Sequence, residues 1–244
     1  MPKARWIVAG SCVAALAVAG VVVAAASGSG GGGQRALSSE EANRLAITRF
    51  RNYEAGGRAV TISVPGPAGN LIVTGSVDYR AKLGYGVVHG TGRDTSSDGL
   101  IEWTATSVRV DPVTDAPATA PAIPPTTGWY SRPLQQTGSS LDSSLLIALS
   151  LGSDRPDNAQ LLPQNGAGWA GHDQVAGRQV DIMTGPAANG SAGTAGTVRY
   201  WIGSDGTMYR VQAALASETQ PAVIDFDTQK YTPMPSAPAT APSR

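Results

Sequence analysis

The sequence predicts an α+β fold that is mainly antiparallel β, with a curved half-barrel sheet packed on a few helices. Apolar and polar residues alternate in many short runs, which is the period of a half-buried strand. Two segments carry apolar residues at helical spacing instead. A composition of 30 Gly and 17 Pro with two Phe is typical of turn-rich β structure rather than of a helical bundle.

The first element is an uncharged apolar segment, 6–26, which follows Lys3 and Arg5. At about 1.5 Å per residue, a helix of this length spans a hydrocarbon core of about 30 Å. Flanking cations keep the short end of such a helix in the cytoplasm. We therefore interpret it as a single-pass transmembrane signal-anchor of the plasma membrane, with residues 1–5 cytoplasmic and the C-terminal domain extracytoplasmic. The small residues ending at Ala26 leave open a cleaved signal peptide and a secreted domain.

A flexible linker is expected over 27–37, because the Gly and Ser residues that dominate it cannot pack. The folded domain is expected over 38–231. It opens with a capping-box pattern, in which Ser38 is followed three residues later by Glu41. Apolar residues at helical spacing then predict one amphipathic helix that stops at Gly56.

Period-two runs within 60–64, 71–79 and 83–87 predict three antiparallel strands separated by proline and glycine turns. The run 100–110 predicts a fourth strand, in which the alternation changes phase as a β-bulge requires. The stretch 111–128 is rich in proline and poor in bulky apolar side chains, so we expect an exposed, disordered insertion there.

Two further helices are expected in the middle of the chain, one through the leucines of 141–149 and a shorter one that reaches Leu162. Asp205-Gly206 predicts a hairpin turn, because Gly supplies the positive φ that such turns need. The tail 232–244 has low complexity and is expected to be disordered. The strands of the last third are expected over 177–184, 198–203, 208–216 and 222–226.

Two stretches carry a resemblance to a known family. Residues 166–182 begin with GAGW and end with GRQVDI, and are similar to the pattern G-x-E-x-V-x-G-V-x-x-Y. Residues 200–210 begin with YWIGSDG and are similar to the pattern W-x-D-x-x-G-x-x-x-R. Together with the order helix, meander, central helices and second meander, they resemble the LolA and LppX lipoprotein-carrier superfamily over 38–226. The resemblance implies a half-barrel sheet over helices, with lipid-like ligands held between them.

Charge and cysteine content exclude several functions. The chain has 18 basic and 18 acidic residues, so no nucleic-acid surface is expected. Cys12 is the only cysteine and lies in the apolar segment, so the exported part has no thiol for disulfides, metal binding or nucleophilic catalysis. We recognise no catalytic residues, no metal ligands and no cofactor motif, and therefore expect a protein that is not an enzyme.

Two pairs of polar residues could suggest catalysis. His172 and Asp173 are adjacent, so their side chains point to opposite faces of an extended segment and cannot form a catalytic pair. Asp225 and Asp227 lie two residues apart on one face of a predicted strand. We interpret this second pair as solvated carboxylates at the edge of a sheet.

The tryptophans and leucines are the candidate ligand-binding residues. Because the chain has two Phe, its Trp side chains supply much of the bulky apolar surface. They either pack the core or line a groove between sheet and helices, where they would contact an apolar chain. The candidate groove residues are Trp103, Trp129, Leu145, Leu146, Leu149, Trp169 and Trp201.

Two functional hypotheses follow. The first is a membrane-anchored extracytoplasmic domain that binds a hydrophobic or lipid-like ligand without catalysis. Its partners would be the membrane, through the N-terminal helix, and that ligand. The alternative is a module for protein–protein interaction in the cell envelope, with a filled half-barrel core. An apolar cavity favours the first hypothesis, and a core packed solid by Trp and Leu favours the second.

Overall fold

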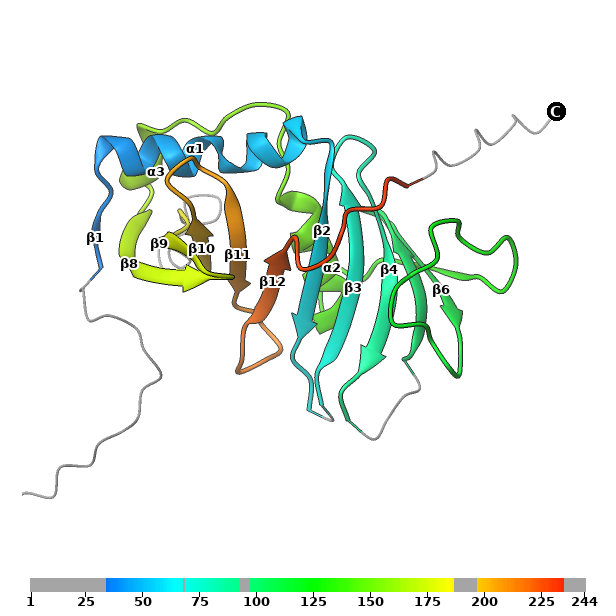
Figure 1. Ribbon diagram of the computed structural model, residues 1–244. Helices are drawn as coiled ribbons and strands as arrows, with labels where there is room; N and C mark the ends of the chain where they lie inside the picture. Colours follow the sequence, from blue (N-terminus) through cyan, green and yellow to red (C-terminus); the bar gives the residue numbers. More distant parts are fainter. Residues whose placement is uncertain (1–33, 68, 93–96, 187–196, 235–244) are drawn as a thin grey trace, which may run out of the picture.

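The structure is a computed structural model that describes residues 34–67, 69–92, 97–186 and 197–234 (Figure 1). The predicted membrane segment 6–26 lies outside these ranges. Among the described residues, no helix has both the length and the apolar character that crossing a membrane requires.

One antiparallel sheet of 12 strands forms the body of the fold. Its order is β1-β8-β9-β10-β11-β12-β2-β3-β4-β5-β6-β7, so two meanders, β2 to β7 and β8 to β12, are joined by the pairing of β12 with β2. The predicted α+β class with a mainly antiparallel sheet is confirmed. The strands are β1 (Arg35–Ala36), β2 (Gly57–Val64), β3 (Leu71–Asp78), β4 (Leu83–Gly90), β5 (Gly99–Trp103), β6 (Ser107–Pro112), β7 (Tyr130–Pro133), β8 (Gly168–Val175), β9 (Arg178–Thr184), β10 (Val198–Ile202), β11 (Met208–Ala213) and β12 (Ala222–Phe226).

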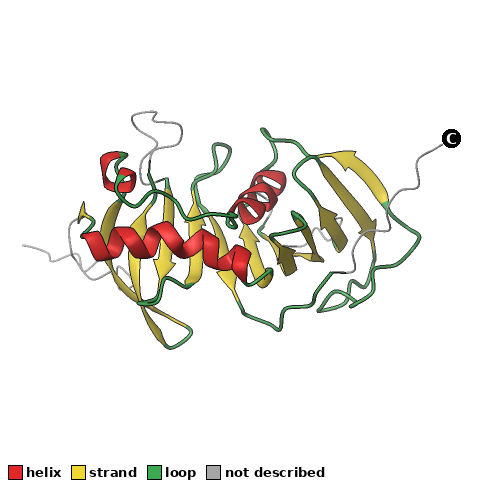
Figure 2. Ribbon diagram, turned by 90° about the horizontal axis from the view of Figure 1, so that it is seen from above, coloured by secondary structure: helices red, strands yellow, loops and turns green. Residues whose placement is uncertain are grey.

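Three helices accompany the sheet in the described part of the chain: α1 (Ser39–Glu54), α2 (Ser140–Ser150) and α3 (Leu161–Gln164). The predicted capping box is present, because Ser38 Oγ accepts from the Glu41 amide at 3.2 Å and Glu41 Oε2 accepts from the Ser38 amide at 2.8 Å. Figure 2 shows α1 and α2 crossing different parts of the same sheet. The helices therefore divide one face of the sheet between them.

The apolar core follows this division. One cluster packs α2 against β2 to β6 and against β11 and β12, and a second packs α1 and α3 against β9 and β10. Tyr200 of β10 packs against both clusters. A third, small cluster of Tyr85, Val87 and Leu100 lies on the opposite face of the sheet, because these residues alternate along β4 and β5 with residues of the first cluster.

The prediction of one bulged strand over 100–110 is wrong. The structure has a tight hairpin there, β5 and β6, closed by the Thr104 amide donating to the Ser107 carbonyl at 2.9 Å. The Thr104 hydroxyl also contacts the Ser107 hydroxyl at 2.9 Å. The change of phase therefore marks a turn held by side-chain hydroxyls, without the glycine or proline that usually indicates one.

Two ranges expected to lack structure contain ordered contacts. The end of the expected linker 27–37 forms β1, which pairs with β8, and Leu37 behind it is buried. In the expected disordered insertion 111–128, Ala116 and Ala120 pack against the third cluster together with Trp129. This segment thus lies on the sheet, because its small side chains find an apolar surface there.

Candidate functional site

Four of the seven predicted groove residues meet beneath α2. Trp103, Leu145 and Leu149 belong to the first cluster and are buried, while Leu146 is half-buried beside them. The Trp103 indole N–H donates to the Leu145 carbonyl at 3.2 Å. The ring occupies space left by Gly84, where an added Cβ would lie 2.1 Å from it. This part of the sheet is therefore filled by the protein's own side chains.

The other three tryptophans lie elsewhere. Trp129 packs on the opposite face of the sheet with the third cluster. Trp201 is buried and donates its N–H to Asp173 at 2.7 Å. Trp169 packs at the edge of the second cluster, where its N–H donates to Asp181 at 2.9 Å. The seven side chains do not form one groove, and their contact with a ligand stays a prediction.

A pocket of about 230 Å³ lies instead between α1, α3 and β10, and we call it the α1–α3 pocket. Sequence reasoning missed it, because its residues come from segments that are far apart in the chain. Its lining residues are Leu45, Thr48, Arg49, Asp157, Asn158, Leu161, Leu162, Asn165, Pro186 and Tyr200.

Local structure fixes the walls of this pocket. Leu45 and Thr48 are three residues apart on α1, so they lie on the same face of the helix. The segment before α3 is held to α1, because the Asp157 amide donates to the Ala46 carbonyl at 2.9 Å. The Ala167 amide then donates to the Leu162 carbonyl at 3.0 Å and turns the chain back toward β8.

The Thr48 hydroxyl is the unusual group in this pocket. Thr48 is 1% exposed, and its Oγ1 has no hydrogen-bond partner among the described residues. A buried polar group without a partner costs about 1–3 kcal/mol. This hydroxyl lies beside the apolar part of the lining, which leucine, proline and tyrosine side chains form.

The charges of the pocket lie at its mouth and are paired. Arg49 contacts Asp157 at 3.3 Å, and both side chains are 34% exposed. Burial raises the pKa of Tyr200, so its phenol is uncharged at neutral pH. Leu161 is 48% exposed, which places an apolar side chain at the entrance. The interior is therefore neutral.

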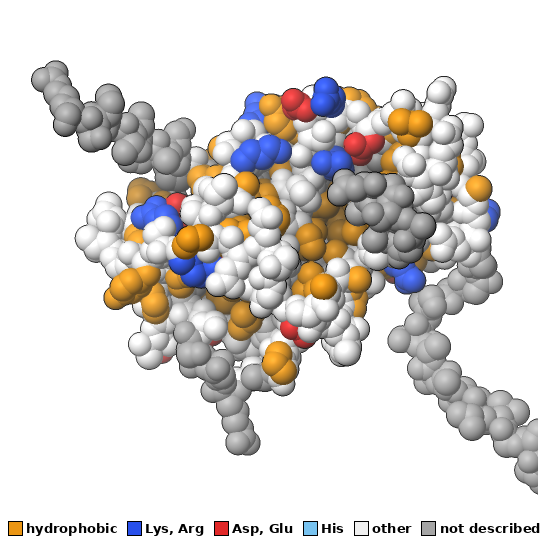
Figure 3. All heavy atoms as spheres, turned by 180° about the vertical axis from the view of Figure 1, so that it is seen from behind, with side chains coloured by type: hydrophobic (Ala, Val, Ile, Leu, Met, Phe, Trp, Pro, Cys, Tyr) orange, Lys and Arg blue, Asp and Glu red, His pale blue; other side chains and the backbone are white. Residues whose placement is uncertain are grey.

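Several half-buried apolar side chains, including Tyr200, lie on the face of the sheet that bears α2. Leu141, Leu146 and Ile147 of α2 and Val198 of β10 pack against the first cluster while remaining partly exposed. We call these four residues and Tyr200 the apolar rim. Figure 3 shows hydrophobic side chains gathered in the middle of this face. Of the predicted groove residues, Leu146 belongs to the apolar rim.

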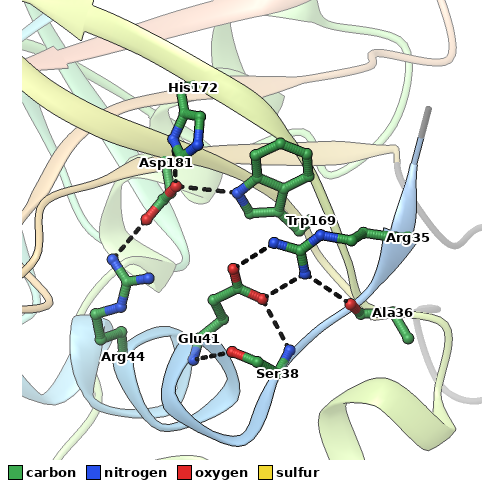
Figure 4. A network of polar contacts seen from close by, with 8 residues as sticks. All are labelled: Arg35, Ala36, Ser38, Glu41, Arg44, Trp169, His172 and Asp181. Carbon is green, nitrogen blue, oxygen red and sulfur yellow. Dashed lines mark hydrogen bonds and ion pairs between the residues drawn. The ribbon is translucent and has the colours of Figure 1, made fainter. Parts of the chain in front are cut away.

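A polar network fastens β8 and β9 to α1, as Figure 4 shows. Asp181 accepts from Arg44 at 2.6 Å and from the Trp169 indole, and contacts His172 Nδ1 at 2.7 Å. His172 and Asp181 are partners across β8 and β9, which adjacency in the sequence could not reveal. Asp173 binds Trp201 instead, so the prediction that His172 and Asp173 diverge is confirmed.

This network connects β8 and β9 to α1. In the described part of the chain, no hydroxyl group hydrogen-bonds to His172. Asp225 forms an ion pair with Arg210, and Asp227 forms one with Arg58. The described residues contain no group of three or more His, Cys, Asp or Glu that could hold a metal ion.

The comparisons with known proteins give no family assignment. No family model matches the chain, and no curated protein does. A similar solved structure is a DUF1329 family protein from Desulfovibrio piger, at 12% identity and a TM-score of 0.35, covering 79% of this chain and 92% of that one. Another is a domain assigned to outer membrane lipoprotein sorting from Vibrio parahaemolyticus, at 8% identity and a TM-score of 0.27, covering 78% of this chain and 91% of that one.

Proposed function

We propose that this chain is a non-catalytic extracytoplasmic domain that binds a hydrophobic or lipid-like ligand, and that the α1–α3 pocket is the site. The observation that supports this most directly is the combination of a lining whose surface is mainly apolar with one buried, unpartnered hydroxyl, Thr48. Ligand pockets typically have apolar walls and a few placed polar groups that fix the orientation of the ligand. Thr48 would be such a group, hydrogen-bonding to a carbonyl, ester or hydroxyl oxygen of the ligand.

The size of the pocket limits what it holds. Its volume is about 230 Å³, below the range of about 300–1,000 Å³ for drug-sized ligands. One short apolar chain, or the end of a longer one, fits this space. A longer chain would extend toward the apolar rim, which shares Tyr200 with the pocket lining. Burial of apolar surface, at about 25 cal/mol per Å², would supply most of the affinity.

We also propose that segment 6–26 anchors the domain to the plasma membrane, as its length and the basic residues before it indicate. A domain on a short linker samples only the nearby membrane surface, so local binding or sensing of lipids fits better than long-range transport. The half-barrel relation to lipoprotein carriers belongs to the same proposal. It is supported by a single antiparallel sheet with its helices on one face.

A second candidate function is protein–protein interaction in the envelope. Two large apolar side chains are exposed here: Ile123, within the proline-rich segment, is 80% exposed, and Tyr130, just after it, is 73% exposed. The filled region beneath α2 is also what this alternative expects. A protein partner would cover Ile123 and Tyr130, whereas an apolar ligand would not, so variants at these positions separate the two functions.

The test uses N-phenyl-1-naphthylamine, a neutral apolar fluorophore, with the chain produced without segment 6–26 and checked for cooperative unfolding. We expect saturable binding that Leu161→Glu weakens at least tenfold, because a carboxylate at the pocket mouth opposes apolar contact; tenfold corresponds to about 1.4 kcal/mol. Ile123→Glu is the matched control and should bind as the parent does. Binding that does not saturate, or that Leu161→Glu leaves unchanged, rules out this pocket as the site.

A further inference from the structure

A second pocket, of about 240 Å³, lies on the face of the sheet opposite the helices. It forms where the proline-rich segment and the residues after β12 lie over β3 and β4, and Figure 1 shows the latter segment crossing β3. We call it the outer pocket. Its lining residues are Thr74, Gly75, Ser76, Tyr85, Thr119, Ala120, Pro121, Gln229, Lys230 and Thr232.

Tyr85 provides an unsatisfied donor in this pocket. The residue is 6% exposed, and its hydroxyl has no partner among the described residues. Burial raises the pKa of Tyr85 to about 12, so the phenol keeps its proton at neutral pH and can donate a hydrogen bond. The ring of Tyr85 packs beside that of Trp129, and their centroids are 6.5 Å apart. This contact helps to hold the phenol in position.

Four other polar side chains of the outer pocket, of Thr74, Ser76, Thr119 and Lys230, also offer donors. The structure gives no ion pair to Lys230 and no side-chain hydrogen bond to Thr74 or Thr119, within the ranges it describes. Ser76 Oγ accepts from the Thr232 amide at 3.1 Å, which leaves the hydroxyl proton of Ser76 free to donate. The lining therefore combines one cation with several hydroxyl groups and contains no carboxylate.

Gln229 has a different role, because it shapes the pocket without facing a ligand. Its amide N–H groups donate to the Val60 carbonyl at 3.0 Å and to the Gly75 carbonyl at 2.8 Å. Its side-chain oxygen accepts from Thr228 at 2.6 Å. These hydrogen bonds hold the segment after β12 against β2 and β3. Lys230, the next residue, therefore lies at the pocket.

We infer that the outer pocket is a second binding site, and that it takes a small anionic ligand rich in hydroxyl groups, of the sugar-acid class. The carboxylate would pair with Lys230 and accept from Tyr85, and the ligand hydroxyls would bond to Thr74, Ser76 and Thr119. This chemistry is the opposite of that of the α1–α3 pocket, whose charges are already paired. The two sites lie on different faces and would act independently.

The experiment is calorimetric titration of the full chain in detergent with three small probes. Glucuronate carries both an anion and hydroxyl groups, glucose carries hydroxyl groups alone, and acetate carries the anion alone. We expect glucuronate to bind at least tenfold more tightly than glucose or acetate. Equal affinity for glucuronate and glucose, or no binding of glucuronate, overturns the inference.

Two variants locate the binding. Lys230→Gln should reduce the affinity for glucuronate to that for glucose, whereas Arg155→Gln removes a charge from an exposed position that lines neither pocket and should have no effect. Tyr85→Phe should weaken glucuronate several-fold without lowering the melting temperature, because it removes a hydroxyl that no described residue satisfies. Glucuronate binding that survives both changes places the ligand elsewhere and contradicts the inference.

Discussion

Asp142 is a fully buried carboxylate near the start of α2, and its partners explain how that burial is tolerated. Both of its oxygens accept from Arg132, at 2.5 and 2.7 Å, and the Gln135 amide donates to it at 2.7 Å. Hydrogen bonds from a guanidinium to a carboxylate are among the stronger polar contacts in proteins. They connect β7, the edge of the sheet, to α2.

Arg132→Met should therefore lower the free energy of unfolding by about 3 kcal/mol, because it leaves a buried charge without its partner. Urea unfolding at pH 7 measures this change. The matched control is Arg109→Met, which removes the cation from the more exposed pair with Glu102 and should cost about 1 kcal/mol or less. Equal losses in the two variants would contradict this account of Asp142.

Glu41 gives the clearest pH dependence. Its hydrogen bonds with Arg35 are the main cause that lowers the pKa of Glu41 to about 2, and the Ser38 amide adds to this effect. Because the folded-state pKa lies below the ordinary value of 4.5, the stabilisation is complete above about pH 4.5 and is lost as the pH falls toward 2.

Glu41→Gln tests this directly, since glutamine keeps the capping-box geometry while removing the charge. Because Arg35 is largely exposed, the variant should be less stable than the parent by about 1 kcal/mol at pH 7, and the difference should shrink at pH 3. Thermal unfolding across this range measures it. A difference that does not change with pH would show that the ion pair with Arg35 adds little to stability.

The Ser38–Glu41 cap could be predicted from the sequence because it is local, whereas the Arg35 partner could not. Arg35 reaches Glu41 because β1 pairs with β8, and a strand of two residues has no period to detect. His172 and Asp181 illustrate the same limit, since they meet only through the register of β8 with β9.

At the scale of elements, the fit of β4 under α2 depends on a glycine. An added Cβ on Gly84 would lie 2.1 Å from the Trp103 ring, and that ring hydrogen-bonds to the backbone of α2. Alternation predicted β4 correctly, but it merged the hairpin of β5 and β6 into one bulged strand. It could not show that Trp103 lies under α2 while Trp129 and Trp201 lie elsewhere, because a period of two does not say which face is the core.

Gly84→Ala should destabilise the fold by about 1–3 kcal/mol, since an extra methyl group must displace a packed indole. Trp103→Leu in the same chain should make the glycine substitution much less costly, because the colliding ring is gone. A double-mutant cycle with urea unfolding should give a coupling of about 1 kcal/mol or more. Additive effects would indicate that Gly84 and Trp103 do not compete for space.

At the scale of the whole molecule, two meanders share one sheet and the helices lie on one of its faces. The class of fold followed from strand periods, turn residues and two helical patterns, all of which are local. The α1–α3 pocket did not, because its existence depends on how well Leu45, Leu162 and Tyr200 fill the space between elements. No periodicity encodes a packing defect of that kind.

The proposed assignment of binding also differs from the groove expected from the tryptophans. Beneath α2 the protein fills its own space with Trp103 and Leu145, while the unfilled space with an unpartnered hydroxyl lies beside Thr48. Apolar ligands enter space that the fold leaves open, so the pocket, rather than the largest side chains, is where the proposed ligand would lie.

Photoaffinity labelling with a diazirine-bearing fatty acid tests whether an apolar ligand occupies the α1–α3 pocket. The full chain in membranes is irradiated, and mass spectrometry locates the labelled residues. We expect labels around Thr48, Leu161 and Tyr200 that unlabelled fatty acid competes away and that Leu161→Glu reduces. Labels that resist competition, or that fall only on residues outside the α1–α3 pocket and the apolar rim, would contradict it.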